Sequence, residues 1–109
     1  MKQLLSTLIL FVAAGVQAAP QQWVLGADTW ERPRDGLAIT QMAPLPAVVS
    51  AWSKEPGQQL LIRYPGGERG QLWAYELRSW LVSLGVPLQS QELVAGSEQA
   101  DQIELELSR

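Results

Sequence analysis

Any chemistry in this chain must come from carboxylates, guanidinium groups and backbone amides, because the sequence contains no histidine and no cysteine. A Ser-His-Asp triad, a histidine-based zinc site, thiolate ligands and disulfides are therefore excluded. The carboxylates all have an ordinary surface explanation. Glu104 and Glu106 alternate with apolar residues, as on the solvent-exposed face of a strand. Glu76 falls on the polar side of a helical pattern. We expect no catalytic residues, no metal site and no cofactor.

Binding chemistry concentrates around the segment Pro65-Gly66-Gly67-Glu68-Arg69-Gly70. This segment follows an apolar strand pattern and precedes a helical pattern, so its backbone N–H groups lie where an anion can bind. It lacks the Lys-Ser/Thr of a P-loop and the spacing of a dinucleotide fingerprint. A flexible turn that leads into a helix is the competing interpretation. The candidate binding residues around this loop are Arg63, Tyr64, Glu68, Arg69 and Arg78.

Hydrophobic spacing predicts the elements that position this loop. Residues 60–64 are a continuous apolar run bounded by turn residues, which predicts a strand. Residues 71–84 carry apolar side chains at helical spacing and are followed by Gly85, which predicts a helix with a left-handed C-terminal cap. Apolar and polar residues alternate strictly over 102–108, as in a strand with one solvent-exposed face. The remaining expectations are strands at 22–25 and 91–95, a helix at 45–55, a short strand or extended connection at 37–40, and a solvated polar loop at 26–36.

The order strand, loop, helix, strand indicates a crossover unit. If the strand at 60–64 and one of the later strands are parallel, the connection through the helix is expected to be right-handed. The sequence therefore predicts an α+β fold: a two-layer sandwich with a small mixed sheet of three to five strands and two helices on one face. Residues 19–109 are long enough for a single small domain, with a polar, turn-rich N-terminal segment.

Five tryptophans are many for a chain of this size. Each buries a large area, so some of them are expected to compensate for a small core. Trp73 and Trp80 belong to the apolar helical stripe and are expected in the core. For Trp23 and Trp30, core and aromatic binding surface stay open as alternatives.

Residues 1–18 have the pattern of a secretory signal peptide. Lys2 precedes a short apolar run, and Val16-Gln17-Ala18 supplies small residues before an expected cleavage site at Ala19 or Pro20. The run is shorter than the roughly 20 residues of a membrane-spanning helix. We expect export to the periplasm or the medium and no permanent membrane span after cleavage. An uncleaved N-terminal anchor helix is the alternative.

The charge balance disfavours nucleic acid as a partner. The chain has 8 basic and 11 acidic residues, a net charge of −3, and loss of Lys2 with the leader makes it −4. Binding to phosphate backbones needs clustered Lys and Arg. The expected partner is instead an envelope protein or a cell-wall component.

The second half of the chain resembles the OmpA-like peptidoglycan-binding domain. Residues 62–70 correspond to that family's strand and polar loop, Leu77-Arg78 to its helix motif, Gly85-Val86 to the residues after the helix, and 103–107 to its closing strand. In the family, a loop Asp holds the diaminopimelate ammonium group and a helix Arg faces the ligand. Gly67 or Glu68 occupies the position of that Asp, and the stretch from loop to Arg78 is about one helical turn shorter. The resemblance implies a related topology and, through Glu68 and Arg78, peptidoglycan binding.

Three functions follow as hypotheses. The first is a non-enzymatic, exported envelope protein that binds or assists another envelope component. The second is a peptidoglycan-binding module that uses Glu68 and Arg78. The third is a hydrolase that uses carboxylates such as Glu68 and Glu76.

Overall fold

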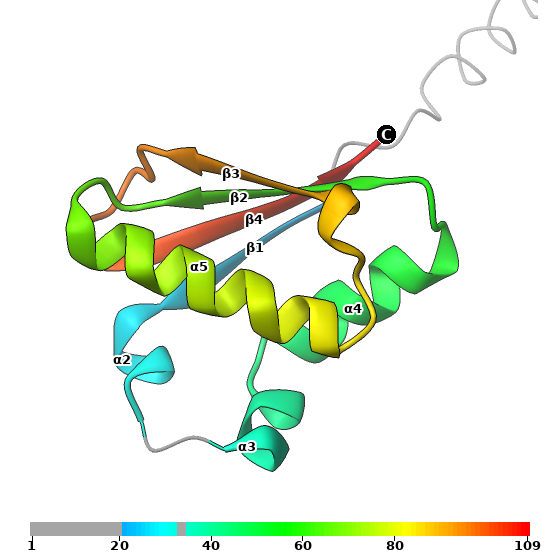
Figure 1. Ribbon diagram of the computed structural model, residues 1–109, viewed down its shortest axis with the longest axis horizontal. Helices are drawn as coiled ribbons and strands as arrows, with labels where there is room; N and C mark the ends of the chain where they lie inside the picture. Colours follow the sequence, from blue (N-terminus) through cyan, green and yellow to red (C-terminus); the bar gives the residue numbers. More distant parts are fainter. Residues whose placement is uncertain (1–20, 33–34) are drawn as a thin grey trace, which may run out of the picture.

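The computed structural model describes residues 21–32 and 35–109 (Figure 1). The expected signal peptide at 1–18 lies outside the described residues. The elements in chain order are β1 (Gln21–Gly26), α2 (Ala27–Trp30), α3 (Gly36–Gln41), α4 (Leu45–Lys54), β2 (Gln59–Tyr64), α5 (Glu68–Ser83), a 3₁₀ turn (Leu88–Ser90), β3 (Gln91–Ala95) and β4 (Gln102–Ser108). None of the described helices combines the length and the apolar character needed to cross a bilayer.

The four strands form one mixed sheet in the order β1-β4-β2-β3. Strand β4 is antiparallel to both of its neighbours, β1 and β2. Strands β2 and β3 are parallel and are joined through α5, so the predicted crossover unit is confirmed. A parallel pair needs such a long connection because the chain must return to the starting edge.

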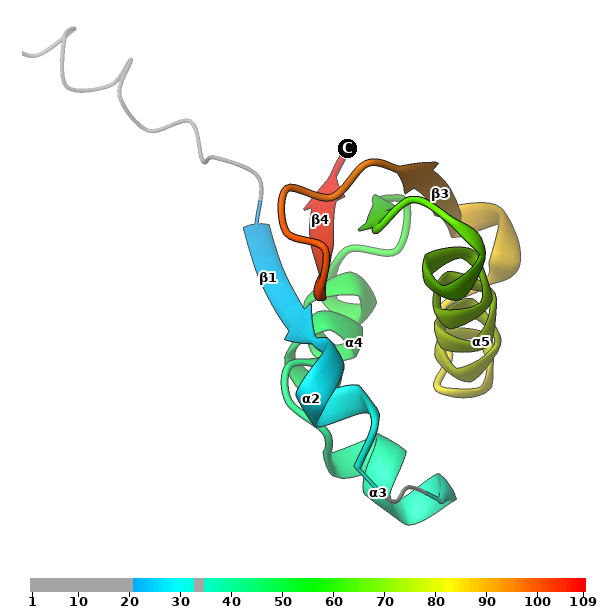
Figure 2. The ribbon, with the colours of Figure 1, turned by 90° about the vertical axis from the view of Figure 1, so that its left-hand side faces the viewer.

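The helices lie on one side of the sheet, and among the described residues none covers the opposite face (Figure 2). The predicted α+β sandwich with a small mixed sheet is therefore confirmed, but with four helices in place of two. Strand alternation produces this arrangement, because β4 turns Ile103, Leu105 and Leu107 toward the helices and Glu104 and Glu106 away from them. One sheet face is thus core and the other is open.

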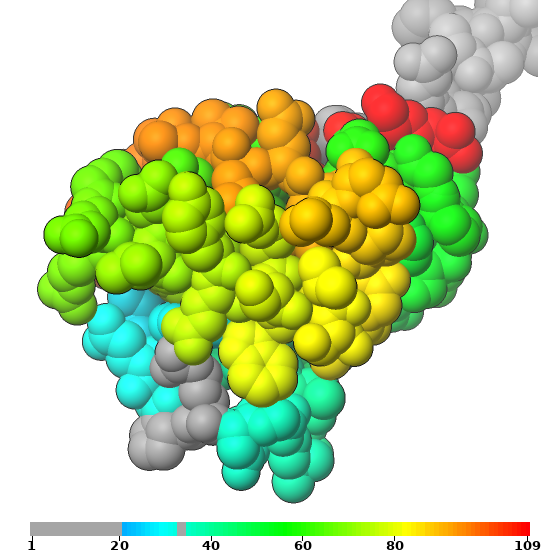
Figure 3. Space-filling model, viewed as in Figure 1, coloured from blue at the N-terminus to red at the C-terminus, as the bar shows by residue number. Residues whose placement is uncertain are grey.

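The core lies between the sheet and the two longer helices. In the space-filling view, α5 crosses the front of the molecule, with α3 below it (Figure 3). The largest fully buried side chains in the described part of the chain are those of Leu25, Ile39, Leu45, Val48, Leu60, Ile62, Leu77, Leu81, Val86, Ile103, Leu105 and Leu107. Each such side chain contributes about 1.5–3 kcal/mol of burial free energy, so the core is small but sufficient for a domain of this length.

The tryptophans belong to this core. Trp73 and Trp80 are partly buried and pack against it, as predicted. Trp30 is 4% exposed and is a core residue, whereas Trp23 is partly buried and packs at the edge of the core. Both residues therefore pack with the core, Trp30 almost fully and Trp23 in part.

Helix α5 begins at Glu68, three residues before the predicted start at Gln71, so the loop shortens to Pro65–Gly67. Gly67 has φ +93°, a left-handed conformation that glycine adopts without strain. At the other end, the Val86 N–H donates to Leu81 O (2.9 Å) and the Gly85 N–H to Val82 O (3.0 Å). With Gly85 at φ +114°, these two bonds form a Schellman cap, which confirms the predicted helix end.

Two predictions for the N-terminal segment were wrong. Residues 27–30 are a short helix within the expected loop, and residues 36–41 form helix α3 where a strand or extended connection was expected. The physical reason in α3 is its cap, because Oδ1 of Asp35 accepts the Ala38 N–H at 2.9 Å. Burial of Trp30 and Ile39 then holds both helices against the core.

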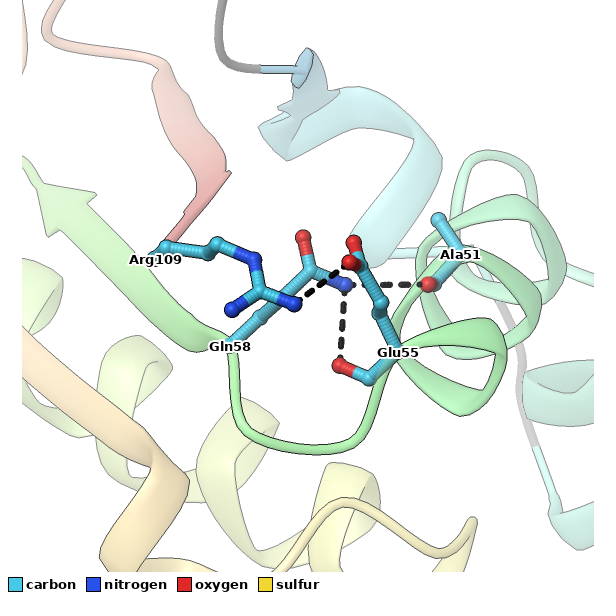
Figure 4. Close-up of polar contacts among 4 residues, drawn as sticks. All are labelled: Ala51, Glu55, Gln58 and Arg109. Carbon is cyan, nitrogen blue, oxygen red and sulfur yellow. Dashed lines mark hydrogen bonds and ion pairs between the residues drawn. The ribbon is translucent and has the colours of Figure 1, made fainter.

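The end of α4 is fixed by a buried amide side chain, that of Gln58 (Figure 4). Its Nε2 donates to the carbonyl oxygens of Ala51 (3.3 Å) and Glu55 (3.1 Å), which the helix leaves without intrahelical partners. The backbone carbonyl oxygen of Gln58 accepts the Trp52 Nε1–H at 3.1 Å. The Glu55 carboxylate also binds the guanidinium of Arg109, so the C-terminus is tied to the same corner.

Candidate functional site

Two hollows flank the end of β2, on opposite sides of the β3–β4 loop. The first, which we call the loop groove, lies where β2 ends and α5 begins and has a volume of ≈ 530 Å³. Its walls include Trp30, Glu31, Gly66, Arg69, Trp73 and Asp101. Ligands of open α/β sheets bind outside the carboxyl ends of the strands, and this groove occupies that position beside the parallel pair β2 and β3.

Backbone contacts fix the walls of the loop groove. The Ala27 N–H donates to Asp101 O at 2.8 Å, which joins the start of α2 to the β3–β4 loop. Gly70 lies directly against the Pro65 carbonyl, since a Cβ added there would be 1.8 Å from that oxygen. Between these two contacts, the rings of Trp30 and Trp73 pack at a centroid distance of 6.4 Å with an interplanar angle of 31°. These contacts define the floor of the groove.

The polar groups of the loop groove are both donors and acceptors. Arg69 Nη2 lies 3.4 Å from Oε2 of Glu31, and both side chains are largely exposed, at 92% and 60%. Such an exposed pair contributes little to stability. Glu76 and Asp101 are further carboxylates among the described residues that line the groove.

One donor beside this groove has no acceptor. The indole Nε1 of Trp73 is shielded from water and makes no hydrogen bond within the described part of the chain. A buried unpaired N–H costs about 1–3 kcal/mol, so it calls for an explanation. Trp52 provides the contrast, because its indole N–H donates to Gln58 O.

The second hollow, the open-face groove, lies on the uncovered side of the sheet and has a volume of ≈ 570 Å³. Arg63 and Glu104 lie at its centre, and Glu98 and Gln99 of the β3–β4 loop form one wall. Arg63 Nε is 3.4 Å from Oε1 of Glu104, and the other carboxylate oxygen accepts the Glu98 N–H at 2.8 Å. The charged groups of Arg63 and Glu104 are therefore already engaged in contacts within the fold.

The five candidate binding residues do not form one site. Arg69 lines the loop groove and Arg63 lines the open-face groove. Tyr64 is partly buried against the core, and its carbonyl oxygen accepts the N–H groups of Gly96 (2.8 Å) and Ser97 (3.1 Å). Glu68 is exposed at the first position of α5. The Arg78 guanidinium lies over the Tyr75 ring, 5.1 Å from its centroid.

Helix geometry separates the residues of the two alternative hypotheses. Glu68 and Arg78 are ten positions apart on α5, or about 15 Å along the axis. Glu68 and Glu76 are eight positions apart, or about 12 Å along the axis. The backbone positions of each pair are therefore separated by about two to three helical turns.

No protein-family model matches the chain, and no curated protein matches it. Within residues 21–32 and 35–109, no group of three or more acidic side chains could hold a metal ion. What the loop groove offers is hydrogen bonding and packing against an aromatic wall.

Sequence reasoning singled out Arg69 but not Glu31 or Asp101 as site residues. These three positions are far apart in the chain, and they meet only because α2 and the β3–β4 loop close around the start of α5. Their spacing carries no signal. The only indication in the sequence was the turn-rich composition of residues 26–36 and 96–101.

Proposed function

We propose that this protein is an exported, non-enzymatic binding or accessory protein of the cell envelope, and that it binds its envelope component in the loop groove. The observation that carries the proposal is the convergence of three chain segments on one hollow at the carboxyl end of the parallel strands. The leader pattern of residues 1–18 supports export.

The groove is better suited to binding than to catalysis. Its guanidinium already faces a carboxylate, and both side chains are well exposed to water, which weakens their effect on any developing charge. The size of the groove lies within the range of about 300–1,000 Å³ typical of small-molecule sites. A segment of a larger envelope polymer would also fit such an open hollow.

The test is to capture envelope components on immobilised protein and to compare the wild type with two charge-reversal variants. Arg69→Glu alters the loop groove, whereas Lys54→Glu makes the same charge change on an exposed residue near the end of α4. We expect the wild type and Lys54→Glu to retain the same component and Arg69→Glu to lose most of it. Equal capture by all three proteins, or capture of nothing above background, would contradict the proposal.

Export is tested separately, by cell fractionation and N-terminal sequencing of the mature protein. We expect the protein in the periplasm or the medium, with Ala19 or Pro20 as its first residue. Recovery only as an intact membrane-bound chain would favour the uncleaved anchor.

A further inference from the structure

The loop groove combines three features that together select a class of ligand. The first is the unpaired indole N–H of Trp73, because this residue also lines the groove. Buried tryptophan N–H groups normally find an acceptor, as that of Trp52 does. A ligand atom with a lone pair, reached through a small rotation of the indole, would supply one.

The second feature is the Glu31–Arg69 pair at the mouth of the groove. It presents an acceptor and a donor side by side, with 3.4 Å between Oε2 and Nη2. An anion placed there meets the Glu31 carboxylate, and a cation meets the Arg69 guanidinium. A pair of neutral hydroxyl groups satisfies both side chains, since a hydroxyl group donates and accepts.

The third feature is the mixed character of the walls. Apolar surface comes from Trp73, Leu72 and Pro65, and polar groups from Glu31, Arg69 and Asp101. A strongly anionic ligand that approached Arg69 would also meet the Glu31 and Asp101 carboxylates, which repel it. A purely apolar ligand would bury these carboxylates without partners, which is costly.

We infer that the loop groove binds a neutral carbohydrate, and this inference rests on the function proposed above. One face of a sugar ring packs on the Trp73 indole, and one sugar oxygen accepts the Trp73 N–H. Adjacent hydroxyl groups bind the Glu31 carboxylate and the Arg69 guanidinium. The ligand class therefore matches both the aromatic wall and the paired donor and acceptor.

The experiment follows the five indole N–H resonances of the ¹⁵N-labelled full chain by NMR during titration with chitotriose and, separately, cellotriose. The indole N–H signals of Trp73 and Trp52 are assigned with the variants Trp73→Phe and Trp52→Phe, because each variant lacks one of the five signals. We expect a neutral trisaccharide to shift the Trp73 signal and to leave the Trp52 signal in place. No shift of the Trp73 signal with either sugar at millimolar concentration, or a shift only with the cationic peptide Lys-Ala-Lys, would overturn the inference.

Affinity measurements on variants make the assignment specific. Trp73→Phe keeps the ring and removes the donor, and we expect it to weaken trisaccharide binding about three- to tenfold. Trp80→Phe, the matched change on the same helix outside the loop groove, is expected to leave affinity unchanged. Glu31→Gln and Arg69→Gln alter exposed side chains and are expected to weaken binding without unfolding the protein. Equal affinities for all four variants would contradict the inference.

The outcome separates this inference from the proposed function. If envelope capture depends on Arg69 while both sugars leave the Trp73 signal unmoved, the carbohydrate assignment is wrong and the binding function stands. If capture also fails, both are wrong.

Discussion

Arg63 and Glu104 face each other across β2 and β4, with 3.4 Å between the guanidinium Nε and the carboxylate Oε1. The second oxygen of the same carboxylate accepts the Glu98 N–H. One glutamate therefore ties the β3–β4 loop to the open face of the sheet. This loop contributes Glu98 to the open-face groove and Asp101 to the loop groove. The contact thus helps to hold a wall shared by both hollows.

A double-mutant cycle on Arg63→Gln and Glu104→Gln is expected to give a coupling energy of about 0.5–1 kcal/mol in urea unfolding. The reason is that the pair is cross-strand and only about one-third exposed. The matched cycle on Arg69→Gln and Glu31→Gln is expected to give a coupling close to zero, because that pair is mostly exposed. Equal coupling energies in the two cycles would show that burial does not distinguish the pairs.

Gly70→Ala is expected to destabilise the protein by at least about 2 kcal/mol, although alanine normally favours a helix over glycine. The new Cβ would lie 1.8 Å from the Pro65 carbonyl oxygen, so the backbone of the turn must move. Gly66→Ala is the control, because a Cβ there meets nothing within 4 Å. Thermal and urea unfolding measure both variants. A Gly70→Ala protein as stable as the wild type would disprove the close approach of α5 to the turn.

Gln58→Ala is expected to lower the free energy of unfolding by about 1–3 kcal/mol. The Ala51 carbonyl would lose its side-chain donor, and the Glu55 carbonyl would keep only the backbone N–H of residue 58. Gln59→Ala changes the neighbouring, exposed glutamine and is expected to have an effect within about 0.5 kcal/mol. Urea unfolding followed by tryptophan fluorescence gives both values. Equal losses would mean that the amide of Gln58 does not cap the helix.

The Glu68→Ala, Arg78→Ala double variant is expected to sediment with purified sacculi to the same extent as the wild type. Neither residue is among those that line the loop groove, where we place binding, and their backbone positions are about 15 Å apart along the axis of α5. A marked loss of sedimentation in the double variant, with an unchanged melting temperature, would instead support peptidoglycan binding through these two residues.

The sequence alone determined the elements whose signals are local. Alternation in residues 102–108 defined β4 and its two faces, and the helical stripe with Gly85 defined most of α5 and its end. The order of strand, loop, helix and strand also indicated a crossover unit, and the structure pairs residues 60–64 with 91–95 in parallel. These signals are strong because every second residue of a strand, and every third or fourth residue of a helix, must face the core.

The tertiary structure decided what depends on contacts between distant segments. Residues 36–41 carry β-branched side chains yet form a helix, because the Asp35 cap and burial of Ile39 outweigh local propensity. Glu31, Arg69 and Asp101 meet in the loop groove only through packing of α2 and the β3–β4 loop around α5. The same packing leaves the Trp73 N–H without an acceptor, which no pattern of residue types encodes. Spacing along the chain shows which face of a helix or strand a residue occupies. Only the folded structure shows which residue from another element lies against that face.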